Sequence, residues 1–519
     1  MVYVVLLLFT GLICSDAANV LVINAFTAKS HYISIRPVGL ELARRGHNVT
    51  VITANKEDNP PPNYHQVMVD NKFLWDVLGT GRPNIFSFVN KTYEEFLTDV
   101  MWTGGYVFTE VVFNSASVKE FLKKDNKFDL VISEQFILEA LNILAYKYKA
   151  PLVLVATVGN CMKHNLVIGN PLQFNTVIHE YLALKNSASL LGRLRNIYAT
   201  VYEYVWWKYW YLGKHEALIK KHLPDLEEPV PSLYEVQKNV SLFLINSHFS
   251  FDTPMALLPN LVEVGGMHLS RSDADLPKDL QDILDKSKHG VIYMNFGSNV
   301  VISEMDEDKK IAFFNVFRKL KQTILMKWEE DVIENKPDNV IVRKWFPQKE
   351  IFAHPNIKVF ISHGGLIGTQ EALFHGIPIL GVPVFADQYN NLELAEQIGF
   401  GKILEYNDIN EKTLGKYLNE MLNDDTYKLK AEEVSQRFKD RPMSSLDTAM
   451  WWIEYVIRHK GADFMKSKTR DMSWFKYFML DIYLVIIVTI VALISLMVIV
   501  VKTFRRLFRV QVTKKLKQK

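Results

Sequence analysis

Residues 340–391 read VIVRKWFPQKEIFAHPNIKVFISHGGLIGTQEALFHGIPILGVPVFADQYNN, and their pattern indicates the fold class. Two apolar runs rich in β-branched residues, KVFIS (358–362) and IPILGVP (377–383), enclose a helix-like segment from about 367 to 375. A strand, a helix and a second strand in this order predict a βαβ unit with a parallel sheet. Because the strands are apolar on both faces, we expect helices to cover each side of the sheet.

The same alternation extends toward the N-terminus and divides the chain into two halves. In the second half, the apolar run GVIYMNFGS (290–298) precedes a helix around 307–321. In the first half, NVLVINAF (19–26) is followed by a helix that ends at Gly46 and by another strand, and the pattern recurs from FDLVIS (128–133) onward. A helix that ends at a glycine between two apolar strands is typical of parallel α/β proteins.

We therefore predict an α/β fold of two Rossmann-like, doubly wound domains that face a cleft. The domains cover 19–264 and 289–445, and the charged stretch 265–288 is the expected linker. Ligands of parallel sheets bind at the carboxyl ends of the strands, so this cleft suits a nucleotide and a second ligand. The sequence has no G-x-G-x-x-G after its first strand and no P-loop motif. A nicotinamide enzyme and a P-loop ATPase are therefore disfavoured.

Two apolar segments lie outside the predicted domains. Residues 2–13, VYVVLLLFTGLI, are followed by small residues up to Ala18, which predicts a signal peptide over 1–18; the alternative is a buried first strand. Residues 483–501 carry no charge over 19 positions. As a helix they span ~28 Å, close to the thickness of a bilayer core, so we predict a transmembrane helix over 481–501.

The charges are distributed unevenly along the 519 residues. The totals are 60 Lys and Arg against 57 Asp and Glu, yet residues 502–519 hold eight basic side chains and no acidic one. Without these eight, 52 basic side chains face 57 acidic ones, a net charge of −5. A mildly acidic body argues against a nucleic-acid binder with a wide cationic face. With 49% hydrophobic and 23% charged residues, the chain is also not a disordered one.

The basic tail predicts the orientation of the chain. By the positive-inside rule, 502–519 lies in the cytosol and the body lies in the lumen. Lys515 and Lys517 resemble a dilysine signal, so we expect the endoplasmic reticulum membrane; a generic basic anchor for anionic lipid is a compatible alternative. Asn48, Asn90 and Asn239 begin N-x-S/T sequons, which predict glycosylation on a lumenal domain. Cys161 is the one cysteine outside the predicted signal peptide, which excludes an intrachain disulfide in the processed chain.

The strand KVFIS delivers His363, Gly364 and Gly365 at its carboxyl end, where a helix starts. Two glycines let the backbone approach a ligand, and the N–H groups at a helix start attract an anion such as a diphosphate. Asp387 and Gln388 follow the next strand and can hold vicinal hydroxyls, as a sugar requires. Alone, an HGG sequence is most often an ordinary strand-to-helix turn. The combination of W-x-P-Q, HGG, Glu371 and ADQ within residues 345–388 is far more specific.

This combination resembles the signature of the UDP-glycosyltransferases of glycosyltransferase family 1, and the resemblance covers nearly the whole chain. The resemblance is strongest to the animal membrane-bound enzymes, and the sequence RKWFPQ indicates the arthropod branch. The resemblance implies the GT-B fold, with an N-terminal acceptor-binding domain and a C-terminal UDP-sugar-binding domain. It also implies that 446–480 holds a helix that returns to the N-terminal half, followed by a juxtamembrane segment.

The resemblance implies a role for each motif residue of the second half. Trp345 and Gln348 bind the uridine, and Glu371 binds the ribose hydroxyls. Asp387 and Gln388 bind the transferred sugar. The residues implied for the diphosphate are Ser298, His363, Gly364, Gly365 and Gly368. Ile367 stands where many relatives have Asn, so a polar contact at that position is in doubt.

The implied catalytic pair lies in the first half. His31 follows the first strand and matches the family's general base, which takes the proton of the acceptor hydroxyl as its oxygen attacks the anomeric carbon with inversion. The alternative is a surface histidine, one of 14. Glu134 stands where the family has an Asp that fixes the imidazole, and Glu139 is the alternative partner. No cluster with metal-ligand spacing is evident, and we predict no obligatory metal or cofactor.

The expected activity is transfer of a hexose from a UDP-sugar to a hydroxyl of a small lipophilic acceptor, as in detoxification or pigment conjugation. For an arthropod enzyme the expected hexose is glucose, and the expected donor is UDP-glucose. The alternative from another class is a weak or inactive GT-B-fold binding or carrier protein for lipophilic ligands. Self-association into a homo-oligomer is left open, and no nucleic-acid partner is expected. The aromatic stretch 198–211 is interpreted as a helix packed on the acceptor sheet, with a patch in the lumenal leaflet as the alternative.

Overall fold

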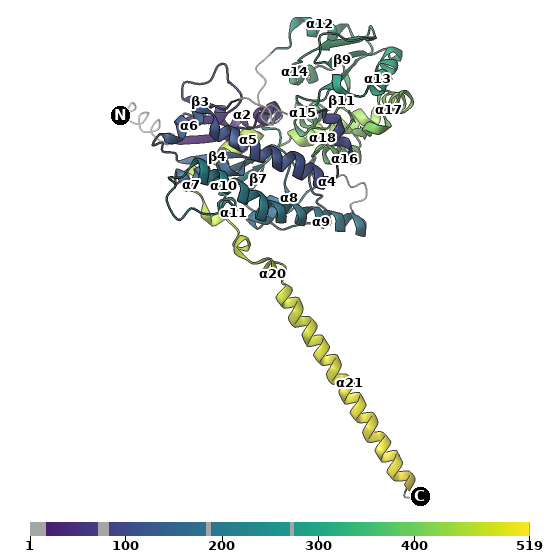
Figure 1. Cartoon of the computed structure of the whole chain (residues 1–519). Helices are drawn as coiled ribbons and strands as arrows, with labels where there is room; N and C mark the ends of the chain where they lie inside the picture. The colour runs from purple at the N-terminus through teal and green to yellow at the C-terminus, as the bar shows by residue number, and fades with distance from the viewer. Residues whose placement is uncertain (1–16, 71–82, 183–187, 270–274, 518–519) are drawn as a thin grey trace, which may run out of the picture. The chain divides into compact units, whose positions relative to one another are not determined.

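The computed structural model describes residues 17–70, 83–182, 188–269 and 275–517 (Figure 1). The chain divides into a larger unit that ends at Lys466 and a smaller unit that begins at Ser467. Most of the signal peptide predicted over 1–18 lies outside the described residues, as do residues 270–274 of the predicted linker.

The first half of the larger unit is a seven-stranded parallel sheet in the order β3-β2-β1-β4-β5-β6-β7. Its strands are β1 (Asn19–Asn24), β2 (Asn48–Thr53), β3 (Tyr64–Met68), β4 (Leu130–Gln135), β5 (Leu152–Ala156), β6 (Leu242–Ile245) and β7 (Leu261–Glu263). Its helical segments are α2 (Lys29–Arg44), η1 (Ile85–Asn90), α4 (Tyr93–Glu95), η2 (Phe96–Trp102), α5 (Thr103–Asn114), α6 (Ala116–Lys123), η3 (Glu139–Asn142), α7 (Ile143–Lys147), α8 (Met162–Ile168), α9 (Leu190–Trp206), η4 (Trp207–Tyr211), α10 (Leu212–His222), α11 (Leu233–Lys238) and η5 (Met267–Leu269).

The second half is a six-stranded parallel sheet in the order β10-β9-β8-β11-β12-β13. Its strands are β8 (Val291–Asn295), β9 (Thr323–Lys327), β10 (Val340–Arg343), β11 (Ile357–Ser362), β12 (Ile379–Gly381) and β13 (Gly401–Ile403). Its helical segments are α12 (Lys278–Lys286), η6 (Ile302–Glu304), α13 (Glu307–Lys319), α14 (Gln348–Phe352), α15 (Leu366–Phe374), α16 (Gln388–Ile398), η7 (Tyr406–Asp408), α17 (Glu411–Asn423) and α18 (Asp425–Lys439). The predicted pair of Rossmann-like sheets is confirmed.

Each sheet is buried on both faces because its strands alternate side chains between two cores. In β1, Leu21 and Ile23 enter one core and Val20 and Val22 enter the other. The strands of the second sheet divide their side chains in the same way, Ile292 and Met294 of β8 on one face and Val291 and Tyr293 on the other. Helices cover both faces, which explains why the strands read as continuous apolar runs.

Two helical segments lie outside the two sheets, one between the halves and one after the second half, and each packs against a different half. The sequence predicts 265–288 as a linker, but α12 lies within it and buries Leu280 and Leu284 in a core of the second half. The connecting segment is therefore shorter than predicted. After the second half, α19 (Ser445–Arg458) buries Met450 and Ile453 against the first sheet beside α2. The larger unit ends with η8 (Asp463–Met465).

The smaller unit consists of η9 (Lys468–Asp471), α20 (Trp474–Tyr477) and the 38-residue helix α21 (Leu480–Lys517). Helix α21 contains the segment predicted to span a membrane, 481–501, and continues through most of the basic tail, so the helix is longer than the predicted span. By length and apolar composition α21 can cross a membrane. Its apolar side chains are exposed over the length of that segment.

Asn48, Asn90 and Asn239, which begin the three sequons, are all exposed. The Asn48 side chain donates a hydrogen bond to Asn19 Oδ1 over 2.9 Å, and Asn239 lies at the end of α11. Exposure is a condition for glycan attachment, and glycosylation at these positions remains a prediction.

Candidate active site

The carboxyl ends of both sheets open into one cavity of about 670 Å³ inside the larger unit. The first half contributes the turn between β1 and α2, with Phe26 and His31, and the strand-end residues Phe136 and Thr157. The second half contributes the turns after β8, β11 and β12. This is where parallel α/β sheets bind ligands, since their strand-end loops converge there.

His31 lies in the first turn of α2, where the chain leaves β1 and enters the cavity wall. Its Nδ1 pairs with Oε1 of Glu134 and lies 3.0 Å from the Thr157 hydroxyl. The imidazole packs against the rings of Phe26 and Phe136, with centroids 4.8 Å and 4.5 Å away. A carboxylate only accepts hydrogen bonds, so Nδ1 carries the proton, and the lone pair of the neutral ring lies on Nε2.

Glu134 is buried near the end of β4 and is held by the two strands that flank it. Asn24, the last residue of β1, donates to Glu134 Oε2 over 2.9 Å. Thr157, the residue after β5, lies 3.3 Å from Glu134 Oε1. The carboxylate is thus fixed from both sides and accepts from His31, Asn24 and Thr157, which orients the imidazole.

Glu139, the alternative partner of His31, lies elsewhere. It begins η3 and accepts a hydrogen bond from Trp207 Nε1 over 2.9 Å. The structure therefore joins Glu134, rather than Glu139, to His31. The sequence does not tell which of the two carboxylates reaches His31, and in the structure the strand residue Glu134 does.

The buried Glu139 leads to a prediction on stability. Burial raises its pKa from 4.5 to about 7, although the charge of Lys163 opposes the rise. The folded chain then binds this proton more tightly than the unfolded chain, and stability falls as the pH rises from about 4.5 to 7. Glu139→Gln keeps an oxygen acceptor for Trp207 without the charge. We expect it to be more stable than the parent by about 1–3 kcal/mol at pH 8, with a smaller gain at pH 5.

The measurement is the thermal unfolding midpoint of the detergent-solubilised chain at both pH values. Glu330→Gln, at an exposed glutamate of the second half, is the control and should change little at either pH. A gain that is larger at pH 5 than at pH 8 would contradict the assigned direction.

A hydrogen-bonded row of side chains crosses the second half's wall of the cavity. Asn295, at the end of β8, accepts from Gly297 N over 2.9 Å and donates to Gln348 Oε1 over 2.7 Å. Gln348 Nε2 in turn donates to Glu371 Oε2. Burial raises the pKa of Glu371 to about 7, and the bond from Gln348 opposes this. The row presents an oriented carboxyl to the cavity from the middle of α15.

His363 follows β11 and is half-buried, with its ring against Gly297 and Gly365. A Cβ atom on Gly297 or Gly365 would lie 3.0 Å or 2.7 Å from its ring, so only glycine fits at these positions without movement of the imidazole. Gly364, which joins His363 to Gly365, has φ of +87°, which also favours glycine. Burial lowers the pKa of His363 to about 4, and its Nδ1 has no hydrogen-bond partner among the described residues. A neutral imidazole with an unpaired nitrogen therefore lines the cavity beside the start of α15.

Asp387 and Gln388 follow β12, at the start of α16. Asp387 accepts a hydrogen bond from Asn391 over 2.8 Å, and burial raises the pKa of Asp387 while this hydrogen bond opposes the rise. The side-chain oxygen Oε1 of Gln388 accepts from the backbone N–H of Val384 and of Phe385. The side-chain nitrogen Nε2 is therefore the atom that can donate to a ligand.

The remaining predicted residues also line the cavity. Trp345 is 51% exposed, and Lys29 Nζ from the first half lies 3.7 Å from the centroid of its ring. Ser298 is exposed after β8, and Gly368 lies in α15 beside Gln348. Ile367 lines the cavity as an apolar side chain, so the polar contact in doubt at this position is absent from the described wall.

Several residues of the site were not found from the sequence. They are Asn24, Thr157, Asn295 and Lys29. The first three end or follow strands β1, β5 and β8, so the strand-end rule was a usable signal for them. No pattern in the sequence indicates Lys29, because its contact with Trp345 depends on how the two halves face each other.

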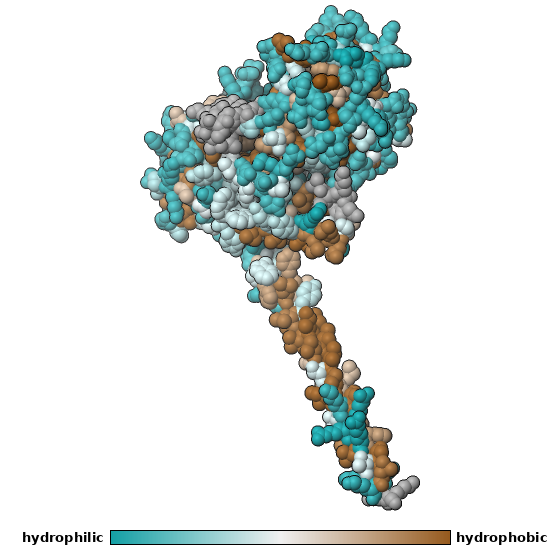
Figure 2. All heavy atoms as spheres, turned by 45° about the vertical axis from the view of Figure 1, so that its right-hand side comes forward, coloured by the Kyte–Doolittle hydropathy of each residue, from teal (hydrophilic) through white to brown (hydrophobic). Residues whose placement is uncertain are grey.

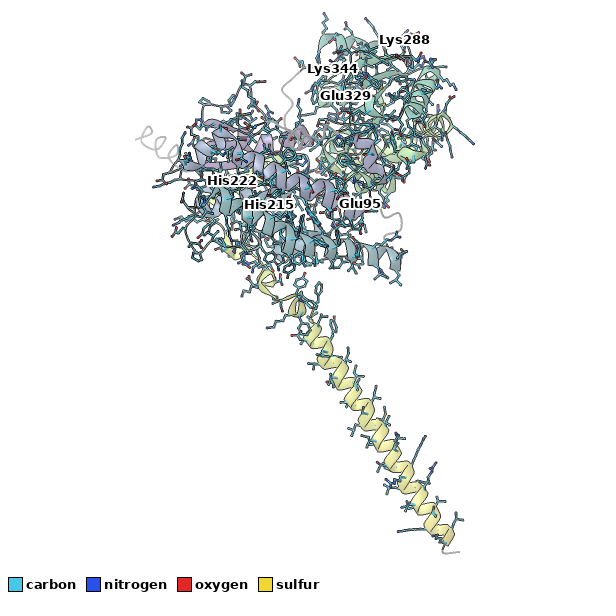
Figure 3. All side chains as sticks on the ribbon, viewed as in Figure 1. Glu95, His215, His222, Lys288, Glu329 and Lys344 are labelled. Carbon is cyan, nitrogen blue, oxygen red and sulfur yellow. The ribbon has the colours of Figure 1, made fainter. Side chains whose placement is uncertain are left out.

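Two other histidines of the first half, His215 and His164, are buried in its interior. His215 of α10 accepts from the backbone N–H of Ala140 over 3.1 Å, and burial lowers its pKa to about 3 (Figure 3). His164 is also buried, and burial holds its pKa well below the usual value. His31 differs from both because it lines the cavity and pairs with a carboxylate.

The two parallel sheets and the cavity at their carboxyl ends form a GT-B fold. The calicheamicin glycosyltransferase CalG4 superimposes with a TM-score of 0.57 at 16% identity, covering 86% of this chain and 99% of that one. LpCGTa, solved in complex with UDP, gives a TM-score of 0.54 at 13% identity, covering 85% of this chain and 100% of that one. These likenesses establish the fold, and the predicted fold class is confirmed.

Sequence comparison gives the family. Residues 18–518 match the family model described as "UDP-glucoronosyl and UDP-glucosyl transferase". UDP-glycosyltransferase UGT5 of Dactylopius coccus is 35% identical over 92% of this chain and 90% of that protein. UDP-glucosyltransferase 2 of the same insect is 34% identical over 94% of this chain and 93% of that protein. The chain therefore belongs to the UDP-glycosyltransferase family and is an enzyme that transfers a sugar from a UDP-sugar to an acceptor.

Proposed function

We propose that this enzyme transfers glucose from UDP-glucose, with inversion, to a hydroxyl of a small lipophilic acceptor. The observation that carries the proposal is the His31–Glu134 pair, which lies across one cavity from the row of Gln348 and Glu371. A base on one wall and a nucleotide-binding row on the other suit a reaction between two bound substrates.

The reaction proceeds in one displacement. His31 Nε2 takes the proton of the acceptor hydroxyl while its oxygen forms a bond to the anomeric carbon. The bond from that carbon to the β-phosphate oxygen breaks on the opposite face, and UDP leaves with the electron pair. Glu134 stabilises the imidazolium that forms. The N–H groups at the start of α15, with the neutral His363, donate to the departing diphosphate.

The residues of the second half that line the cavity are proposed to bind the UDP-sugar. Trp345 stacks on the uracil, and Gln348 lies beside the uridine. Glu371 accepts from the ribose hydroxyls, while Asp387 and Gln388 hold the hexose. Ser298 and the turn of Gly364, Gly365 and Gly368 contact the phosphates. These groups orient the diphosphate by hydrogen bonds, and we propose no obligatory metal.

Replacement of Glu371 by alanine is expected to raise the Kd for UDP roughly 10- to 100-fold, since two hydrogen bonds to a buried carboxyl are lost. Glu371→Gln, which keeps one oxygen acceptor and the contact to Gln348, should be affected less. The measurement is titration calorimetry of the detergent-solubilised chain with UDP. Glu330→Ala is the matched control, and an unchanged Kd in Glu371→Ala would remove Glu371 from the nucleotide site.

The acceptor side is mostly apolar, which favours lipophilic acceptors. Its lining includes Phe88, Phe96, Val100, Met101 and Phe108 from η1, η2 and α5. Such a wall binds phenols, flavonoids or steroids by burial of apolar surface, and the hydroxyl is oriented toward His31. Conjugation of lipophilic compounds, in detoxification or in pigment formation, is the corresponding role.

We further propose that the enzyme is anchored in the endoplasmic reticulum membrane by α21, with the larger unit in the lumen and the basic tail in the cytosol. The length and apolar composition of α21 and the eight basic residues after position 501 support this orientation. The lumenal side is the compartment in which Asn48, Asn90 and Asn239 receive glycans. Endoglycosidase treatment of the chain expressed in insect cells tests it, and a chain of unchanged mobility would contradict lumenal placement.

The activity is tested with radiolabelled donors and a panel of phenols, flavonoids and steroids. We expect transfer from UDP-glucose in preference to UDP-glucuronic acid and UDP-galactose, and a β-linked product by NMR from the α-linked donor. An α-linked product would contradict inversion. The alternative of a GT-B-fold carrier predicts acceptor binding without transfer from any UDP-sugar, and the contact of Glu134 with His31 weighs against it.

A further inference from the structure

Helix α9 presents its apolar side to the outside of the larger unit. Its large exposed hydrophobic residues recur at helical spacing and lie 39–68% exposed along one face: Leu190, Leu191, Leu194, Ile197, Tyr198, Val201 and Val205. Trp206, Tyr209 and Trp210 extend the exposed aromatic surface into η4. In Figure 2 hydrophobic side chains run along the lower edge of this unit, where Figure 1 places α9. This is the reverse of a soluble surface helix, which turns its apolar side to the core.

The opposite face of α9 is small or polar and is buried. It consists of Gly192, Asn196, Ala199, Thr200 and Glu203. Asn196 donates to the carbonyl oxygens of Phe174 and Val177 over 3.0 Å and 2.7 Å and accepts from His179 N over 2.8 Å. Polar groups buried in this way must keep their partners, so this face cannot turn outward without breaking several hydrogen bonds.

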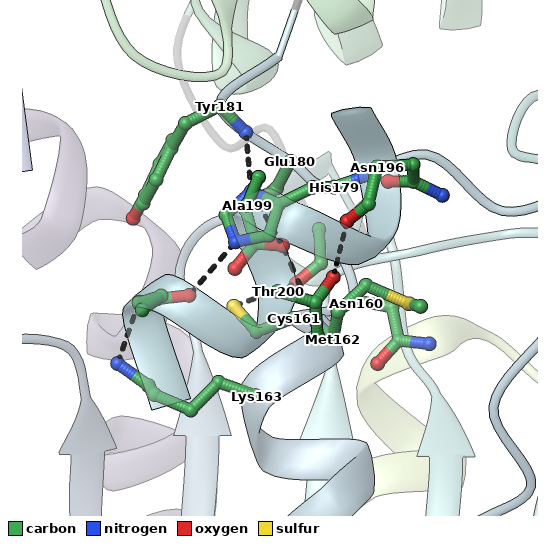
Figure 4. Close-up of polar contacts among 12 residues, drawn as sticks. Asn160, Cys161, Met162, Lys163, His179, Glu180, Tyr181, Asn196, Ala199 and Thr200 are labelled. Carbon is green, nitrogen blue, oxygen red and sulfur yellow. Dashed lines mark hydrogen bonds and ion pairs between the residues drawn. The ribbon is translucent and has the colours of Figure 1, made fainter. Parts of the chain in front are cut away.

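A buried ionic network fixes the same face (Figure 4). Glu203 lies 2.9 Å from Lys163 Nζ and 2.9 Å from His179 Nε2. Burial opposes ionisation of Glu203, but Lys163 and His179 outweigh it, so the pKa of Glu203 is lowered. His179, Glu180 and Glu203 also have the spacing of metal ligands, but the Lys163 ammonium supplies the positive charge at Glu203. The network therefore holds α9 in place rather than indicating a metal site.

We propose that the exposed face of α9 and η4 lies in the headgroup region of the membrane that carries the enzyme. The charges around it fit anionic lipid. Arg193, Arg195, Lys208 and Lys214 lie in or beside this segment, and Glu203, which is buried, is the one acidic residue of the sequence from 188 to 214. An apolar face with exposed tryptophan and tyrosine and a basic border is typical of a helix that lies in a membrane interface.

The chain itself brings this face to a bilayer. Residues 467–479 separate the larger unit from α21, and 13 residues reach at most roughly 45 Å even when fully extended. This step rests on the membrane anchor proposed above. Within that reach a second interfacial contact costs little entropy, because the first one already confines the unit near the surface.

The inference is tested on the full chain in phosphatidylcholine and phosphatidylserine vesicles. An environment-sensitive dye is attached in Tyr209→Cys, where the parent side chain is 74% exposed, and in Leu429→Cys of α18, where it is 62% exposed. The unsubstituted chain gives the background labelling of the buried Cys161. We expect lipids spin-labelled near the headgroup to remove roughly half or more of the fluorescence at position 209 and little at position 429. The substitutions Leu194→Glu, Val201→Glu and Val205→Glu together should abolish the difference.

Carbonate extraction of the same vesicles reports the anchor separately. An anchored chain with equal quenching at both positions overturns this inference alone, whereas a chain that is extracted contradicts the anchor and this inference with it. Shielding of position 209 from iodide without quenching by lipid assigns the face to a protein neighbour, such as a second copy, and also overturns it. Since the three glutamates replace exposed side chains, an unchanged unfolding midpoint confirms that the variant is folded.

Discussion

His31→Ala is expected to lower kcat by roughly 10³-fold while it changes the Kd for UDP by less than about twofold. The imidazole is the base that takes the proton of the acceptor hydroxyl, and without it the hydroxyl must attack while still protonated. The ring contacts Glu134, Thr157, Phe26 and Phe136, all of the first half, so its removal leaves the hydrogen-bonded row in the second half intact. Steady-state kinetics at saturating UDP-glucose and titration calorimetry with UDP measure the two effects.

His65→Ala is the matched control, because His65 is an exposed histidine of β3 away from the cavity. It should retain full turnover. Loss of UDP affinity in His31→Ala to the same extent as kcat would indicate general unfolding, and unchanged turnover would remove His31 from the mechanism.

The second large effect is expected at Glu134. Glu134→Gln keeps the size but loses one of the two oxygen acceptors and the charge that stabilises the imidazolium, and we expect kcat to fall roughly 10²- to 10³-fold. Glu134→Asp restores the charge on a side chain one methylene shorter and should lie between the parent and Glu134→Gln. KM for UDP-glucose should stay nearly constant in both variants, since Glu134 lies on the acceptor side.

A double variant distinguishes a positioning role from a merely structural one. If Glu134 acts through His31, then His31→Ala combined with Glu134→Gln is no slower than His31→Ala alone, because residues that act as a unit are not additive. Multiplied losses in the double variant would mean that Glu134 acts independently of His31. A parallel fall of the unfolding midpoint and of kcat across the series would assign a structural role instead.

The sequence was sufficient to predict the two sheets because the relevant signals are local. A parallel strand buried on both faces must be largely apolar, and β1, β8 and β11 are, as is the first half of β4, Leu130–Ile132. The linker was less predictable. Helix α12 is rich in charged residues, and its three apolar side chains, Leu280, Ile283 and Leu284, pack it against the second half. A short and mostly charged segment of this kind reads equally well as a connector.

The candidate site was predictable where a motif marks it and not where it depends on tertiary contacts. His363, Glu371 and Asp387 follow strands in a recognisable order. The choice between Glu134 and Glu139 required the structure, because both lie near the end of β4 and only the direction of each side chain separates them. The aromatic stretch 198–211 was interpreted as a helix packed on the acceptor sheet. That holds for the buried Trp207 and Tyr211 of η4 and is wrong for the exposed Trp206, Tyr209 and Trp210.

The position of Glu134 on a strand has a consequence for how such an enzyme diversifies. Its carboxylate is fixed by the neighbouring strand ends, at Asn24 and Thr157, whereas the apolar lining comes from η2 and α5, outside the sheet. Substitutions in that lining reshape the space for the second substrate and leave the geometry of proton transfer as it is. Selection can therefore act on selectivity and on reactivity as separate traits, so a gene duplicate can acquire new substrates while its chemistry stays intact.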